Sequence, residues 1–592
     1  MQITQQTVLG VVKSAAARHW VMREADERNA MAIAQRFGLP DTLSRLLALR
    51  NVQIEDVERF LSPKLNQLLP DPSKLKDMDK ATKRLVNAIQ SGEKIAVFGD
   101  YDVDGATSSA VLINYFRQLN IDVEAYIPDR MKEGYGPNAP AFEKLYQNGA
   151  RLVVTVDCGT MAHEALEAAE KMGLDVIVAD HHQTGTEMPS CYALINPRRA
   201  DDESGLGYLA AVGVTFLLVV GLNRALREAG YFENTNEPDL MRLLDVVALG
   251  TVCDVVPLIG VNRAFVNQGL KVMSARQNIG LKALADICKL DNVPIAFDCG
   301  FKLGPRVNAG GRVGASDLGV RLLTSQDPDE AAALALRMDE LNQERRDIGD
   351  KALARAEEMV AEILSTRNGL PPALLLADRQ FHAGVIGIVA GRLKDKYRRP
   401  CFVVALDEEN NGKGSARSVS AVDIGKIVAK AVRQNIIAGG GGHAMAAGVT
   451  LAEGQLQAFE TYLDEELGAM SFDQPETMMI DATISTSAAT REFYDTFQQI
   501  GPFGADSPEP KFVIPAARVM KADIVGENHV RCILSSEGGK SLKAIAFASI
   551  AEPVRDMLYQ TKAPLHIAGY LRADDWQGRQ NVQFMIQDVA LA

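Results

Sequence analysis

Between residues 94 and 179 the chain alternates short, β-branched apolar runs with amphipathic segments. The runs at 94–99 (KIAVFG), 151–156 (RLVVTV) and 175–179 (DVIVA) have the length and composition of buried β-strands. The segments at 107–119 and 161–172 carry apolar residues at helical spacing. Strands that alternate with helices predict βαβ units, and therefore a parallel sheet covered by helices.

The pattern changes on either side of this region. Residues 329–364 are charged and helical in spacing, with Gly349 as the one interruption, so they predict a long connecting helix. Apolar runs at 373–377 and 401–406 begin a second α/β unit, and short strands with turn signals from about Glu476 indicate a small β-barrel. We therefore expect an α/β protein with an N-terminal helical segment (1–75), a parallel-sheet catalytic domain (76–325), a connecting helix (326–366), a second α/β domain (367–468) and a C-terminal β-barrel (469–592).

Composition narrows the class of protein. The longest apolar runs, such as 152–156 and 216–220, are far shorter than the ~20 residues of a membrane span. The N-terminal stretch shows no cleavable signal segment. The 7 cysteines are scattered without a C-x-x-C pair, which fits reduced thiols in a cytoplasm. A net charge of −13 argues mildly against nucleic-acid binding, although a local basic groove can coexist with an acidic total.

Acidic residues follow each of the three predicted strands. The carboxyl ends of parallel strands share one edge of a sheet, so these side chains would converge on one spot and repel one another. Divalent metal is the usual resolution, and oxygen ligands with one or two imidazoles suit Mn²⁺ or Mg²⁺ better than zinc. The residues concerned are Asp100, Asp102 and Asp104 in DYDVDG, Asp157 in DCG, and Asp180, His181 and His182 in DHH.

Two other roles compete for these aspartates. D-x-D-x-D-G also opens an EF-hand calcium loop, but that loop needs a glutamate at its twelfth position, where this chain has Val111, and a helix before it. An aspartate after a strand is often a helix N-cap, and this role stays open for any one of them. Three such strand ends together favour a metal site.

The ordered motifs DYDVDG, DCG, DHH and GTVCDVVPL, which contains Asp254, resemble those of the DHH phosphoesterase superfamily. Later motifs resemble the RecJ family of single-stranded-DNA-specific 5′→3′ exonucleases, including its DHHA1 half. They are GPRVNAGGR (304–312), FHAGVIGIVAGRL (381–393), GSARS (414–418) and GGGGHAMAAG (439–448). The last ~115 residues resemble the OB-fold domain of that family. Similarity covers nearly the whole chain.

The resemblance implies phosphodiester hydrolysis with two Mn²⁺ ions, and Mg²⁺ as the alternative ion. Asp157 would be the bridging ligand, and His182 would lie beside the scissile phosphate. How Asp100 and Asp102 divide between the ions stays open. No nucleophile from the protein is needed. The implied metal ligands are Asp100, Asp102, Asp104, Asp157, His181 and Asp254.

The resemblance also implies where the DNA strand binds. Ser415 and Arg417 match positions that contact the terminal 5′-phosphate, for which the planar fork of arginine is suited. Further candidates are Arg130 and Arg312, whose competing role is that of a surface or salt-bridged arginine, and His443. In the barrel, the candidates for stacking on bases are Tyr570, Trp576 and Phe584, the last with a core position as its competing role.

Two local sequences depart from the family pattern. GPFG continues with Ala505, Asp506, Ser507 and Pro508 instead of Gly-Asn-Pro, and the N-terminal R-G-I signature is Arg50-Asn51-Val52 here. Neither departure touches the proposed metal site. The first concerns the loop that joins the barrel to the rest of the chain.

Other functions on the same scaffold stay open. An oligoribonucleotide or cyclic-dinucleotide phosphodiesterase, or a pyrophosphatase, would usually lack the terminal barrel. A non-catalytic single-strand-binding replication scaffold would have broken acidic motifs, whereas every acidic position is intact here. For the exonuclease, the resemblance implies single-stranded DNA as substrate, no membrane, and cooperation with a single-strand-binding protein and a RecQ-type helicase in recombination and DNA repair.

Overall fold

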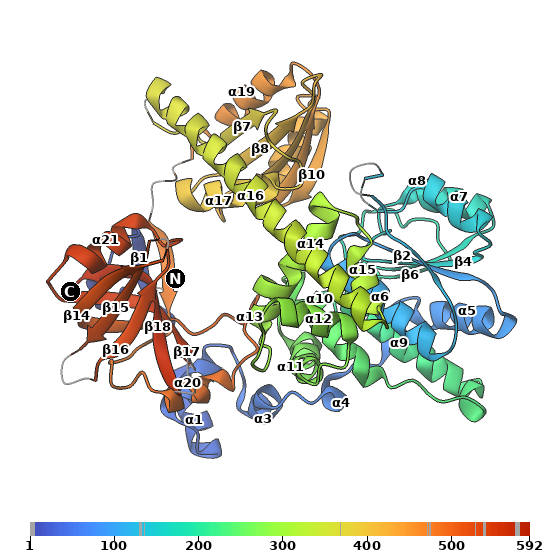
Figure 1. Cartoon of the computed structure of the whole chain (residues 1–592), viewed down its shortest axis with the longest axis horizontal. Helices are drawn as coiled ribbons and strands as arrows, with labels where there is room; N and C mark the ends of the chain where they lie inside the picture. Colours follow the sequence, from blue (N-terminus) through green and yellow to red (C-terminus); the bar gives the residue numbers. More distant parts are fainter. Residues whose placement is uncertain are drawn as a thin grey trace.

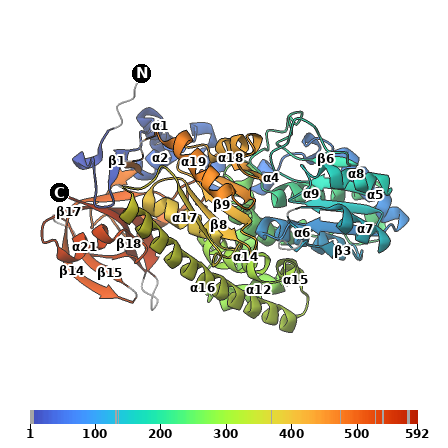
Figure 2. The same cartoon turned by 90° about the horizontal axis from the view of Figure 1, so that it is seen from above.

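The computed structural model describes residues 6–129, 133–134, 136–367, 369–470, 472, 475–526, 528–536, 540–574 and 580–592. A parallel-sheet domain and a β-barrel lie on opposite sides of the molecule (Figure 1). The long helix α16 (Pro328–Thr366) runs from the first domain to a second sheet, and the turned view shows it along one flank (Figure 2). Among the described residues, no helix is long and apolar enough to cross a membrane.

The first domain is built on a parallel sheet with the strand order β3-β2-β4-β5-β6. Every residue of β2 and β4 is buried, because helices cover both faces. Helices α5, α6 and α9 cover one face, and α7 and α8 cover the other. The bounds are Ile95–Gly99 (β2), Glu124–Tyr126 (β3), Leu152–Val156 (β4), Asp175–Ala179 (β5), Ala193–Ile195 (β6), Met78–Ser91 (α5), Val103–Gln118 (α6), Ala139–Gln147 (α7), His163–Lys171 (α8) and Ala211–Glu228 (α9). The predicted βαβ arrangement is confirmed.

A helical part follows the sheet and leads into α16, which is 39 residues long. Near its start α16 packs against α12, α14 and α15, and further along it packs against α17 (Ile386–Tyr397). The predicted connecting helix is therefore present and joins two domains. The helices before it are Leu244–Cys253 (α10), Gly260–Ser274 (α11), Ile279–Ile287 (α12), Ala296–Asp298 (α13), a π-helical turn at Cys299–Leu303, Gly304–Val313 (α14) and Leu318–Thr324 (α15).

The second sheet has the order β10-β11-β9-β8-β7. Helices α16 and α17 pack on one face through an apolar cluster that includes Leu374, Cys401 and Val403. Helices α18 and α19 pack on the other face, against Phe402 and Val404. The bounds are Leu374–Asp378 (β7), Cys401–Leu406 (β8), Gly412–Arg417 (β9), Gly439–His443 (β10), Ala446–Leu451 (β11), Ile424–Arg433 (α18) and Gln455–Leu467 (α19).

The C-terminal strands close into the predicted β-barrel. Strand β14 pairs with β15 on one edge and with β17 on the other, and β16 and β18 complete the closure. Phe512 and Phe584 are fully buried in its core, so Phe584 is a core residue and not a surface for bases. The bounds are Phe512–Val525 (β14), His529–Ser535 (β15), Leu542–Ala546 (β16), Leu565–Asp574 (β17), Asn581–Leu591 (β18), Arg491–Gln498 (α20) and Glu552–Gln560 (α21).

The N-terminal segment differs from its predicted all-helical character. It contains the strand β1 (Arg18–Met22), which pairs in parallel with β12 (Glu476–Ile480) beside the barrel. The partner strand lies more than four hundred residues away along the chain, so no local pattern could reveal the pairing. The helices that follow are Glu27–Phe37 (α1), Asp41–Ala48 (α2), Val57–Leu61 (α3) and Leu65–Leu68 (α4).

A buried carboxylate fastens this segment to the barrel. Asp588 is fully buried and accepts hydrogen bonds from the Ser14 hydroxyl (2.5 Å), the Ala16 amide (3.1 Å) and the Trp20 indole N–H (3.0 Å). Trp20 is itself fully buried. The N-terminal segment and the barrel therefore share one packed core.

We predict that Asp588→Ala releases this segment. Three buried donors would lose their acceptor, so the free energy of unfolding should fall by roughly 2–5 kcal/mol. Urea denaturation followed by Trp20 fluorescence, in a Trp576→Phe background, measures the change. The matched control is Asp523→Ala, a half-exposed aspartate paired with Lys521 on the barrel surface, which should cost clearly less because surface ion pairs contribute little. Equal losses in the two variants would contradict the assigned role of Asp588.

Candidate metal centre

The strand ends bring the predicted acidic residues together. Asp100 directly follows β2, Asp157 follows β4 and Asp180 follows β5. Asp254 arrives from another direction, at the C-terminal end of α10. Three overlapping sets of ligand atoms each lie within 4.8 Å of one another: Asp100, Asp102 and Asp157; Asp157, His181 and His182; and Asp104, His181 and Asp254.

The first motif has a capping role as well as a place in this cluster. The Asp102 side chain accepts hydrogen bonds from the amides of Asp104 and Gly105, so it is the N-cap of α6. A Cβ at Gly105 would collide with the Asp100 carbonyl, and glycine therefore lets α6 start against the end of β2. A strand precedes this motif and Val111 is buried within α6, so the EF-hand alternative is wrong.

Asp104 is held at the start of another helix. Its carboxylate is 1% exposed and accepts hydrogen bonds from the amides of Ala211 (2.7 Å) and Val212 (2.9 Å), the first residues of α9. The partial positive charge of that helix end stabilises a carboxylate there. One edge of the cluster is thus fixed by backbone groups.

The backbone is strained at one member of the cluster, Asp157, and next to another, Asp254. Asp157 has φ +60° and Val255, which follows Asp254, has φ +59°. The left-handed region is unfavourable for side chains with a Cβ, above all a β-branched one, and costs on the order of 1–3 kcal/mol per residue. Strain of this kind collects at functional sites because the surrounding fold fixes the residue in place.

The two histidines are oriented differently. His181 Nδ1 lies 3.1 Å from the Leu209 carbonyl and must donate to it, so its Nε2 carries the lone pair. That Nε2 lies 3.4 Å from Asp157 Oδ1 and 3.7 Å from Asp104 Oδ2. Burial lowers the pKa of His181 to about 4, helped by the charge of His182, so the ring is neutral and can bind a metal.

His182 is held by Asp180. Its Nδ1 donates to Asp180 Oδ1 at 2.7 Å, and its side chain is 39% exposed. Asp180 also accepts from the amides of Thr160 and His181. Burial raises the pKa of Asp180, but the hydrogen bond and charge of His182 outweigh burial and lower it, so Asp180 is a carboxylate that positions the ring.

The sequence patterns do not predict one residue of this hydrogen-bond network, Asn196. Asn196, fully buried after β6, donates through Nδ2 to the His182 carbonyl and to the Thr160 hydroxyl, each at 2.9 Å. Its Oδ1 accepts from the Arg198 amide. Asn196 therefore ties the DCG and DHH loops to β6. The one signal in the sequence is its position at the end of a short apolar run, as for the aspartates.

The carboxylates repel one another because they are buried together. Burial, followed by the charges of Asp102 and its neighbours, raises the pKa of Asp104 to about 7 and raises the pKa of Asp157 well above its usual value. Burial and the charges of Asp104 and Asp102 raise the pKa of Asp254 to about 9. Without a compensating cation, part of the cluster would hold protons at neutral pH.

These residues fit a divalent cation. The donors are carboxylate oxygens and a neutral imidazole, a set that suits Mn²⁺ or Mg²⁺. Asp254 Oδ2 is buried and accepts no hydrogen bond. The neighbouring thiols of Cys158 and Cys253 have their pKa raised well above the usual value by burial, so they are protonated packing groups and not metal ligands.

The second sheet places Ser415 and Arg417 at the start of α17. Arg417 donates to the Ser415 hydroxyl at 3.0 Å, and a Cβ at Gly387 would come within 3.0 Å of both side chains. Burial alone lowers the pKa of Arg417, with no acidic group among the causes. A guanidinium and a hydroxyl at a helix N-terminus form an arrangement suited to phosphate.

Helix α14 lies between this arrangement and the metal cluster. A Cβ at Gly311 would come within 2.8 Å of the Tyr101 carbonyl, in the DYDVDG loop. The next residue, Arg312, donates to the Gly384 carbonyl just before α17. Across the second sheet, Arg417 pairs with Ala446 and Ala446 with His443, so Arg417 and His443 lie in one register row. Arg130 and Trp576 fall outside the described residues.

A parallel sheet with a carboxylate-and-histidine cluster at its strand ends, a second α/β domain and a C-terminal barrel define a DHH-type phosphoesterase with a third domain. Three family descriptions match in the same order. The DHH family, N-terminal domain, matches residues 94–251, the DHHA1 domain matches 371–469, and the RecJ OB domain matches 480–588.

Curated proteins and solved structures agree. RecJ of Escherichia coli, a single-stranded-DNA-specific exonuclease, is 34% identical over 93% of this chain and 96% of its own length. RecJ of Bacillus subtilis is 32% identical over 98% of this chain and 71% of its own length. The structure of Thermus thermophilus RecJ in complex with Mn²⁺ matches with a TM-score of 0.78 at 26% identity, covering 96% of this chain and 79% of that one. This chain belongs to the RecJ family.

We predict that the metal-free protein loses stability as the pH rises from about 5 to about 9. Unfolded aspartates release their protons near pH 4, whereas Asp254 keeps its proton to about pH 9, so the folded state binds more protons across this range. Thermal midpoints measured in EDTA should therefore fall with pH, and Mn²⁺ should reverse the fall.

Asp254→Asn removes the carboxylate that must take up a proton when the metal-free protein folds. At pH 8 it should raise the midpoint in EDTA and shrink the shift caused by Mn²⁺, while the exposed Asp291→Asn should leave both unchanged. Midpoints in EDTA that do not depend on pH would show that the cluster is not under electrostatic stress.

Proposed function

We propose that this protein is a single-stranded-DNA-specific exonuclease that degrades its substrate from the 5′ end to mononucleotides, in recombination and DNA repair. The observation that carries the proposal is the convergence of the acidic cluster at the strand ends, with a phosphate-suited arrangement one helix away. The barrel and its match to the RecJ OB domain favour this function over a sister phosphodiesterase. The intact acidic cluster favours it over a non-catalytic scaffold.

Each group in the cluster has a proposed role. Divalent ions, Mn²⁺ or Mg²⁺, would offset the carboxylate charge and polarise the scissile phosphodiester. His182, with Nδ1 held by Asp180, would offer Nε2 as a proton donor to a phosphate oxygen or to the 3′-oxygen that leaves. The residues that would hold the ions are Asp100, Asp102, Asp104, Asp157, His181 and Asp254.

The direction of degradation would come from Ser415 and Arg417, which would bind the terminal 5′-phosphate. Arg312 links α14 to the loop before α17, so the proposed phosphate site and the metal cluster are joined by one rigid helix. His443 would contact the strand from the neighbouring β10. Arg130 and Trp576 remain predictions from the sequence as further contacts with DNA. Cooperation with a single-strand-binding protein and a RecQ-type helicase is proposed from family membership.

A time course on one 5′-phosphorylated oligonucleotide, labelled separately at each end, tests the direction. With Mn²⁺ present, the 5′ label should appear at once as a mononucleotide while the 3′-labelled strand shortens stepwise. A blunt duplex of the same sequence should resist digestion, because a duplex is too wide for a site between two sheet domains and a barrel. First release of the 3′ label, or rapid digestion of the duplex, would overturn this proposal.

Arg417→Ala tests the phosphate site. The wild type should prefer a 5′-phosphate over a 5′-hydroxyl end, and the variant should lose roughly 10- to 100-fold of that preference, the worth of one charge-assisted hydrogen bond. Competition between the two substrates in kcat/KM measures it. The control is Arg367→Ala, whose guanidinium pairs with Glu460 and Asp464 at the far end of α16. An undiminished preference in Arg417→Ala would place the 5′ end elsewhere.

A further inference from the structure

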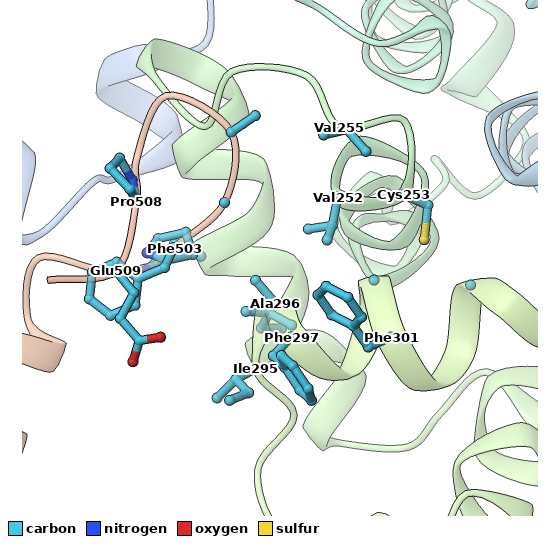
Figure 3. A pocket seen from close by; sticks show the side chains of 18 of the residues that line it. Val252, Cys253, Val255, Ile295, Ala296, Phe297, Phe301, Phe503, Pro508 and Glu509 are labelled. Carbon is cyan, nitrogen blue, oxygen red and sulfur yellow. The ribbon is translucent and has the colours of Figure 1, made fainter. Parts of the chain in front are cut away.

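A cavity of about 860 Å³ opens between the helical part of the first domain and the barrel. One wall comes from α13 and the π-helical turn after it, and the opposite wall comes from the loop at 501–509 and from β17. The close view shows Phe297 and Phe301 on one side and the loop that carries Phe503 and Glu509 on the other (Figure 3). The volume lies within the roughly 300–1,000 Å³ of pockets that enclose small organic groups.

Two aromatic rings stand exposed in this cavity. Phe297 and Phe301 are 44% and 66% exposed, and their rings stack with centroids 4.6 Å apart and an interplanar angle of 22°. Phenyl rings normally contribute to stability by being buried. Among the described residues, Phe547 is the one other exposed phenylalanine. The second ring stands on a π-helical turn, and such turns are frequent at functional sites.

The barrel side of the cavity adds polar and cationic groups. The Arg572 guanidinium lies 5.7 Å from the centroid of the Phe297 ring and is ion-paired with Glu509. Tyr570 lines the same wall, and Asn267 and Asn308 line the cavity from the first domain. The cavity therefore combines flat apolar faces with donors and acceptors at its edges.

This cavity borders the turn that carries Asp254, a member of the acidic cluster. Cys253 and Val255, the residues on either side of Asp254, both line it. Val255 is 70% exposed and has the left-handed backbone described above, so the turn that carries Asp254 forms part of the cavity wall. A chain whose phosphodiester lies at the metal cluster can thus place a neighbouring group in the cavity.

We propose that Phe297 and Phe301 form a stacking platform for a nucleobase of the strand being degraded. This inference rests on the proposed function and assigns a nucleotide subsite apart from the phosphate site at α17. Of the barrel residues predicted from the sequence to stack on bases, Tyr570 lines the same cavity, opposite the two phenyl rings. A nucleobase is the flat group that fits stacked phenyl rings, and stacking accepts every base, as degradation of any sequence requires. The two asparagines and Arg572 would contact the edges of the base and the backbone.

Equilibrium binding tests the platform without relying on catalysis. Fluorescence anisotropy in EDTA measures Kd for a labelled single strand in which one abasic site is moved along the first positions from the 5′ end. For the wild type, one position should weaken binding roughly 5- to 100-fold, the usual worth of one stacked base. In Phe301→Ala the intact strand should bind weakly, and the abasic site at that position should cause no further loss.

The diagnostic result is that the loss of affinity caused by the abasic site and the loss caused by Phe301→Ala do not add. Phe301→Trp should retain the dependence on the base at that position, and Tyr559→Ala, which removes a 57%-exposed ring from α21 of the barrel, should behave as wild type. Equal sensitivity to every abasic position in wild type and Phe301→Ala would overturn the platform, and would leave the cavity for another occupant such as an apolar peptide.

The same variants separate this inference from the proposed function. If wild type binds the strand with the positional pattern but does not degrade it, the exonuclease assignment fails and the platform stands. If wild type degrades the strand from its 5′ end while Phe301→Ala has an unchanged KM and an unchanged abasic profile, the platform fails and the exonuclease assignment stands.

Discussion

The repulsion between carboxylates buried at the ends of three parallel strands is the constraint on which the rest of this structure depends. Asp104 and Asp157 are almost completely buried, and burial together with the charges of Asp104 and Asp102 raises the pKa of Asp254 to about 9. Such an arrangement is stable only because the surrounding fold holds the carboxylates in place. The start of α9 donates two amides to Asp104, and the backbone at Asp157 and Val255 is held in the left-handed region. Part of the folding free energy of the domain thus offsets the strain and the repulsion within this cluster.

The same constraint explains which parts the sequence could predict. A parallel sheet must gather its strand ends at one edge, so the apolar runs before Asp100, Asp157 and Asp180 predict that the residues after them converge. Asp254 follows a helix, and only the family resemblance points to it. The second-sheet strand at 401–406 was predicted with its observed bounds for a related reason, since a strand buried on both faces is a continuous apolar run. In the sequence, capping is an alternative to metal binding. In the structure Asp102 caps α6 and also lies in the acidic cluster, because one carboxylate has enough oxygens for both roles.

What could not be predicted depends on contacts between distant segments. The pairing of β1 with β12 and the hydrogen bonds to Asp588 need both ends of the chain, and no local periodicity encodes either. Asn196 has no motif of its own, and its role exists only once the DCG and DHH loops lie side by side. Phe297 and Phe301 have the spacing of a buried helical stripe. The sequence does not show that these rings line a cavity, because the cavity exists only once the barrel lies opposite them.

The arrangement of the three proposed contacts gives a physical reason for stepwise cutting in one direction. The phosphate-suited residues lie on the side of α17, whereas the cavity with the aromatic rings lies on the side of the barrel, and the turn of Asp254 lines that cavity. A strand that spans both sites has its 5′ end at one side of the metal cluster and its continuing chain at the other. Hydrolysis that releases the first nucleotide with its 3′-hydroxyl leaves a new 5′-phosphate on the remaining strand. That phosphate is the same group that Arg417 is proposed to bind, so each cut would regenerate the end required for the next one.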